Sequence, residues 1–84
     1  MEKKEVGEVI HFFGKIMVAA IKLSDTVKTG DKLLVEGATT GFEQVIESMQ
    51  IDNNDVPEAK AGDDIGIKVK ERVREGDRVY KVIE

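Results

Sequence analysis

The sequence predicts an all-β domain, more specifically a six-stranded closed antiparallel β-barrel. No segment shows the 3.6-residue period of an amphipathic helix, whereas Val, Ile and Thr are frequent. Eight glycines divide the chain into short segments, as is typical of strands separated by turns. A closed barrel is favoured for such a set of strands because closure leaves no exposed sheet edge.

The strands are expected in six segments of the chain. The first two should form a hairpin, because a tight Gly-centred turn at 13–15 separates them. The third and the last each follow a Gly-Asp pair, and the fourth follows a glycine-rich loop at 37–41. Residues 52–62, which contain the one proline, are expected to form a long loop before the fifth strand. The expected strands are 5–13, 16–23, 31–36, 41–51, 64–70 and 77–83.

The fifth and the first two strands differ in their pattern. In 64–70, apolar residues alternate with polar ones, which places one face in a core and the other in water. The hairpin 9–23 is apolar on both faces, so it must be covered on both sides. We favour cover by the chain's own loops, with a protein partner as the open alternative. A partner would contact the hairpin at an apolar face around Ile10, Phe12, Met17 and Ala19.

A short motif of a basic residue, any residue, Gly and Asp occurs three times, at 28–31, 60–63 and 74–77. Glycine can adopt the positive φ of a tight turn, and the aspartate that follows can accept hydrogen bonds from nearby backbone amides. An acidic metal site would instead need several oxygens to converge from one loop. The position of each pair before an expected strand favours the turn.

Length and composition limit the class of protein. At 84 residues the chain is expected to form a single domain, residues 1–84. It has no cysteine, and its longest apolar run, 16–21, is too short to span a bilayer. Because its first residues also lack the apolar core of a signal peptide, we expect a cytoplasmic protein.

The charge is unevenly distributed along the chain despite the net charge of −4. Residues 33–59 contain no Lys or Arg, whereas the C-terminal part is rich in both. A basic end of the molecule could contact RNA or an acidic partner, with an affinity that falls steeply as salt rises. The candidate contact residues are Lys68, Lys70, Arg72, Arg74 and Arg78.

No catalytic constellation is apparent. His11 is the sole histidine, and only Ser24 and Ser48 offer a serine hydroxyl as nucleophile. We therefore expect His11 to be a strand residue with a bonded or solvated ring, and we expect no enzyme activity, metal or cofactor.

The order of the motifs resembles the second domain of translation GTPases of the elongation factor Tu type, a small β-barrel. The resemblance rests on "LSDTVKTGDKLLVEG" (23–37), "VIESMQIDNNDVPEAKAGDDIGIKV" (45–69) and "VREGDRVYKV" (73–82). It implies a stand-alone translation-protein barrel, and by position it places Gln50 and Ile51 where that family holds the end of transfer RNA. Because the GTPase domain has no counterpart, the chain by itself should bind no nucleotide.

Two binding functions follow from this. The chain is interpreted first as a translation-factor-like module that docks on RNA or on a translation partner. The alternative is an accessory barrel for protein interaction, since a similar barrel forms the C-terminal domain of some collagenase-like peptidases. On that alternative, the apolar face of the hairpin 9–23 would contact the partner enzyme.

Overall fold

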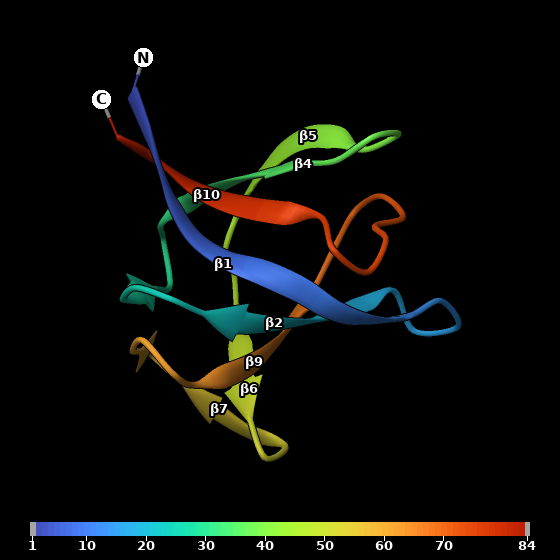
Figure 1. Ribbon diagram of the computed structural model, residues 1–84. Helices are drawn as coiled ribbons and strands as arrows, with labels where there is room; N and C mark the ends of the chain where they lie inside the picture. The colour runs from blue at the N-terminus through green and yellow to red at the C-terminus, as the bar shows by residue number, and fades with distance from the viewer. Residues whose placement is uncertain (1, 84) are drawn as a thin grey trace.

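The computed structural model describes residues 2–83 and confirms an all-β domain (Figure 1). Within this part of the chain there are ten strands and no helix, so no helix is available to cross a membrane. The strands are β1 (Glu2–Phe13), β2 (Val18–Leu23), β3 (Val27–Lys28), β4 (Lys32–Glu36), β5 (Gly41–Val45), β6 (Met49–Ile51), β7 (Asn54–Val56), β8 (Glu58–Ala59), β9 (Asp64–Lys68) and β10 (Arg78–Ile83).

Eight of the strands form one antiparallel sheet in the order β5-β4-β10-β1-β2-β9-β6-β7, and β3 pairs with β8 separately. The first and last described residues lie side by side, because Glu2 on β1 pairs with Ile83 on β10 (Figure 1). The alternation expected in the fifth strand is confirmed, since Ile65 and Ile67 are buried and their neighbours are not. The inward side chains of the large sheet form one core.

A short connection joins β5, at one end of the sheet, to β6, next to the other end. β5 and β6 stand far apart in the strand order, yet only residues 46–48 separate them in sequence. In Figure 1 the yellow-green connection runs behind the other strands from β5 to β6. Within residues 2–83 no backbone ladder joins β5 to β6, β7 or β9, so the predicted closed six-stranded barrel is not confirmed.

The side chain of Gln44 bridges the gap between β5 and the end of β9, here called the seam. Its Nε2 donates a hydrogen bond to the carbonyl of Lys68 at 2.8 Å, and its Oε1 accepts one from the amide of Lys70 at 3.0 Å. The amide group of the side chain thus makes the same two bonds that a backbone peptide would make in a ladder.

Replacement of Gln44 by alanine is expected to lower the free energy of unfolding by about 1–2 kcal/mol, because each net hydrogen bond contributes about 0.5–1.5 kcal/mol. Gln50→Ala is the matched control. The Gln50 amide donates to the Asp55 side chain within the β6–β7 hairpin, and its loss should cost less than about 0.5 kcal/mol. Urea unfolding of both variants measures the difference, and equal losses would contradict a role of Gln44 in the seam.

The three Gly-Asp pairs are turns, as predicted, and they share one geometry. Their glycines have φ between 92° and 94°. In each turn the aspartate Oδ2 accepts a hydrogen bond at 2.9 Å from the amide three residues earlier. The aspartate amide donates back to the carbonyl of that same residue at 3.0–3.1 Å. The aspartates are Asp31, Asp63 and Asp77.

Each turn also holds one apolar residue of another segment by two backbone bonds. The glycine amide donates to the carbonyl of that residue, and the aspartate carbonyl accepts from its amide, at 2.8–2.9 Å. The residues held are Val9, Leu23 and Ile46, all buried. The turns are therefore corners that fix the chain onto the core.

Two segments differ from the expectation. The expected strand 41–51 divides into β5 and β6, because Ile46 bonds to the turn at 30–31 in place of a neighbouring strand. The expected loop 52–62 contains β7 and β8. Asp52 and Asn53, with φ of 51° and 64°, form the two-residue turn between β6 and β7. Asp and Asn tolerate this left-handed conformation better than other residues with a side chain.

The hairpin of β1 and β2 is confirmed, with Phe13 paired to Val18. Its connection differs from the Gly-centred turn that was predicted, because the residue with positive φ is Met17, at 55°. Gly14 is not among the residues with positive φ.

Candidate functional site

A groove of about 420 Å³ lies on the outer face of the sheet, over β2, β9 and β6, and is here called the β2–β9 groove. Ala20 and Gly66 are direct neighbours across β2 and β9 and line its floor. Phe13 and Ile16, from the first hairpin, are 47% and 60% exposed and line one wall. The groove therefore has an accessible apolar surface.

The opposite rim of the β2–β9 groove is polar and acidic. Gln50 follows Gly66 across the sheet, and the turn that contains Asp52 borders the groove beside it. Asp64 lies at the start of β9, with Lys22 as its neighbour on β2. Among the ion pairs of residues 2–83, none involves Asp52 or Asp64, and Lys22 makes none with Asp64. The two carboxylates thus remain available to a cationic ligand.

A second cavity, of about 560 Å³, lies at the seam. It brings together Lys68 and Lys70, two of the predicted basic contact residues, beside Val45 and Glu47. The carboxylate of Glu47 on the lining of this cavity reduces its positive potential.

The other predicted basic residues do not gather with these two lysines. Arg78, on β10, lies 3.4 Å from a carboxylate oxygen of Glu5 and 3.3 Å from one of Glu8. Arg72 stacks over the ring of Phe12 at 5.6 Å, and Arg74 opens the third Gly-Asp turn. His11 pairs with the carboxylate of Glu75 at 3.1 Å, as expected for a bonded strand histidine. The basic residues that are close in sequence are therefore divided among different neighbours.

The remaining predicted contact residues lie in different environments. Gln50 lines the β2–β9 groove, whereas Ile51 packs partly against the core. Ile10 is 42% exposed, Phe12 is half-buried against the core, and Met17 occupies the hairpin turn.

Ala19 is wholly buried, so the predicted apolar partner face does not include it. Its side chain points inward because β2 alternates, with Ala19 and Ile21 inside. Loop cover of the hairpin is also wrong for Ile10, Phe13 and Ile16, which are exposed. Sequence reasoning missed Phe13, Ile16, Ala20 and Gly66 as groove residues. The signal that could have found them is Gly66, a glycine inside an otherwise regular strand.

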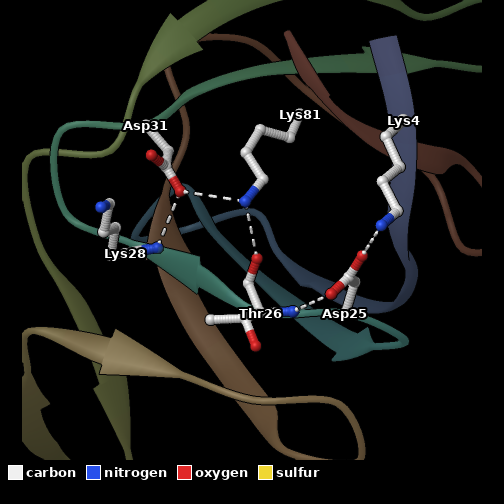
Figure 2. A network of polar contacts seen from close by, with 6 residues as sticks. All are labelled: Lys4, Asp25, Thr26, Lys28, Asp31 and Lys81. Carbon is white, nitrogen blue, oxygen red and sulfur yellow. Dashed lines mark hydrogen bonds and ion pairs between the residues drawn. The ribbon is translucent and has the colours of Figure 1, made fainter. Parts of the chain in front are cut away.

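A polar network ties the segment 25–31 to β1 and to β10 (Figure 2). Lys81 Nζ donates to the Thr26 carbonyl at 3.0 Å and lies 3.7 Å from Asp31 Oδ2. Lys4 Nζ lies 2.6 Å from Asp25 Oδ2, and the Thr26 amide donates to Asp25 Oδ1 at 2.7 Å. The network is a structural support, because its charges are directed at one another.

Asp25 is expected to make stability depend on pH. The hydrogen-bonded ion pair with Lys4, and then the bond from the Thr26 amide, hold the pKa of Asp25 below its usual value. A carboxylate whose pKa is lowered in the folded state stabilises that state, and the contribution is complete above the unfolded pKa of about 4. The contribution is lost as the pH falls from there through the lower pKa of the folded state. The stability lost in Asp25→Asn should therefore be largest near neutral pH and shrink in acid. Urea midpoints measured across pH would show a constant difference if Asp25 has no such role.

The comparisons with known proteins identify relatives among peptidases. No family model matches the chain. An uncharacterized protease of Methanocaldococcus jannaschii is 49% identical over 79 residues, which cover 93% of this chain and 19% of the protease. A collagenase of Porphyromonas gingivalis is 34% identical over 82 residues, covering 95% of this chain and 23% of the collagenase. The chain thus spans about a fifth of the length of these relatives.

A solved structure has the same fold. The C-terminal domain of a protein described as a U32 peptidase, from Geobacillus thermoleovorans, superposes with a TM-score of 0.89 at 20% identity. The superposition covers 95% of this chain and 93% of that domain. The identification with the second domain of translation GTPases is therefore wrong, because both the sequence relatives and the matching structure are proteins named as peptidases or collagenases.

Proposed function

We propose that this chain is a non-catalytic accessory domain that works with a U32-type, collagenase-like peptidase by protein interaction. The observation that carries the proposal is the 49% identity to a protease of which the matched segment forms only 19%. The rest of that protease has no counterpart in these 84 residues. A segment of this kind can contribute binding while the reaction takes place elsewhere.

The local chemistry supports a binding role. The single histidine is exposed and directed at Glu75, and the sequence has no cysteine to act as a nucleophile. The features that stand out are the β2–β9 groove and the exposed apolar residues of the first hairpin. Exposed apolar surface of this kind is typical of interaction sites.

We also propose that the sheet closes into a barrel at the seam between β5 and β9. The short crossing from β5 to β6 and the two bonds of the Gln44 side chain support closure at the seam. A closed seam presents no free strand edge between β5 and β9, so a partner at the seam would contact side chains there.

Affinity capture tests this function. The 84-residue chain is immobilised and incubated with extract of its source cells, with and without nuclease. We expect a U32-type peptidase to be retained in both cases, and the purified peptidase to bind in a separate assay. Retention of ribosomal components alone, lost on nuclease treatment, would overturn the proposal in favour of an RNA partner.

A further inference from the structure

We infer that the β2–β9 groove binds an extended peptide that places one large apolar side chain in the groove and a neighbouring Lys or Arg at its acidic rim. The inference deepens the proposed function, on which it rests, by assigning the accessory domain a class of ligand.

The first observation is the glycine at the floor of the groove, which neither the backbone nor the packing requires. Gly66 lies in the middle of β9, between β2 and β6, where a glycine weakens a strand. Its backbone does not require glycine, because its φ is not among the positive values. The packing does not require it either, since an added Cβ would meet only Val18 Cγ1, at an ordinary 3.5 Å.

The absence of a side chain at Gly66 leaves the floor of the groove open. Gly66 and Ala20 are adjacent across the ladder, so two small residues leave a depression on the outer face. A glycine in a strand interior often marks a bulge, a tight bend, or a place where a ligand or another backbone approaches closely. The pairing of β9 with β2 and β6 shows no register shift at Gly66, which argues against a bulge. The groove volume of about 420 Å³ lies within the range of sites that hold small ligands or anchoring side chains.

The walls define the apolar part of the ligand. Phe13 and Ile16 remain about half exposed beside the groove. An aromatic or large aliphatic side chain inserted between them would cover both. Aromatic side chains are typical anchors for such pockets.

The rim defines the charge of the ligand. Asp52 and Asp64 border the groove, and no ion pair among residues 2–83 involves them. A Lys or Arg next to the apolar anchor would complement these carboxylates. A nucleic acid would meet repulsion here, because its phosphates are negative. A second copy of the chain is also disfavoured, since a two-fold contact centred on the groove would bring two acidic rims together.

Binding of short synthetic peptides tests the inference. The capped peptides Gly-Phe-Arg-Gly, Gly-Phe-Glu-Gly and Gly-Ser-Arg-Gly are titrated into the isotope-labelled chain up to about 5 mM, since a single anchor gives millimolar affinity. We expect the first peptide to shift the amide resonances of Ala20, Gly66 and Gln50. The other two should bind at least about fivefold more weakly, because each lacks one half of the recognition. Groove shifts caused by none of the peptides, or caused by a single-stranded RNA oligonucleotide, would overturn the inference.

Matched variants locate the site. Gly66→Val fills the floor and should weaken binding at least about tenfold, as expected for an anchor pocket. Gly41→Val is the control, because Gly41 begins a different strand, has no positive φ and has nothing within 4 Å of the position of an added Cβ. Asp64→Asn should weaken the arginine peptide about two- to fivefold without weakening Gly-Phe-Glu-Gly, as for an exposed ion pair.

The variants also separate this inference from the proposed function. A well-dispersed spectrum shows that Gly66→Val is folded, and unchanged peptide binding by that folded variant would overturn the groove as the site. If no peptide binds but a U32-type peptidase is still captured, the groove inference fails and the accessory function stands. If the peptides bind as expected and no peptidase is captured, the groove stands and the accessory function fails.

Discussion

Replacement of Gly37 by alanine is expected to lower the free energy of unfolding by about 3 kcal/mol or more, out of roughly 4–13 kcal/mol for a domain of this length. A Cβ at position 37 would overlap the carboxylate of Asp77, with Asp77 Cγ only 2.6 Å away. Asp77 cannot move aside freely, because it is 6% exposed and its Oδ2 holds the Arg74 amide at 2.9 Å. Displacement of the carboxylate would therefore also break the third corner turn.

The double variant Gly37→Ala/Asp77→Ala shows whether the carboxylate is the obstacle. Asp77→Ala alone should cost about 1–2 kcal/mol, since it loses one hydrogen bond and leaves a backbone amide without its partner. The double variant should be about as stable as Asp77→Ala, because the alanine at 37 then meets no carboxylate. Gly41→Ala is the control and should change little, as Gly41 has open space. Additive losses in the urea unfolding of the two single variants and the double would show that the steric explanation is wrong.

The corner turns could be predicted from sequence because their determinants are local. Gly30, Gly62 and Gly76 each precede an aspartate, and the pair sets both the positive φ and the hydrogen bond within four residues. The contact between Gly37 and Asp77 could not be predicted in this way, since it joins segments far apart in the chain. The division of 41–51 into β5 and β6 has a similar cause, because Ile46 is held by a distant turn.

The candidate binding residues could be predicted even less well, because their surroundings also depend on contacts between distant segments. The five basic residues between 68 and 78 were predicted to form one basic surface because they are close in sequence. Arg78 instead meets Glu5 and Glu8, which β1 brings beside β10. The β2–β9 groove combines residues from the first hairpin, β9 and the β6–β7 turn, so no single stretch of sequence contains it. Gly66, a glycine inside a strand, is the one groove residue that the sequence alone could have indicated.

The wrong identification with translation factors has a physical explanation in the turns. The motifs that supported it are the corners that fix Val9, Leu23 and Ile46 to their neighbours. Corner residues specify how a chain folds, and one fold can serve several unrelated functions. The motifs were therefore evidence for a small β-domain, whereas the choice between protein families depended on similarity along the whole chain.

Replacement of Gly7 by alanine is the second change for which we expect a large loss, again about 3 kcal/mol or more. Gly7 lies on β1 at the irregularity where the pairing with β10 shifts register. A Cβ there would come within 2.8 Å of both Ile21 Cγ2 and the backbone carbonyl oxygen of Lys22. Both obstructing residues, Ile21 and Lys22, lie on β2, and β2 is paired with β1 on one side and with β9 on the other.

The obstacle at Gly7 includes backbone, and this predicts a different response from that at Gly37. Trimming Ile21 to alanine removes Cγ2 but leaves the Lys22 carbonyl in place, and it also opens a core cavity that costs about 2–5 kcal/mol. The variant Gly7→Ala/Ile21→Ala should therefore be less stable than either single variant, up to loss of the cooperative fold in urea. A double variant as stable as Ile21→Ala would show that the side chain was the whole obstacle. Since β2 is held by ladders to β1 and β9, the carbonyl can retreat only if two strand pairings yield together, whereas the Asp77 carboxylate can be removed by one substitution.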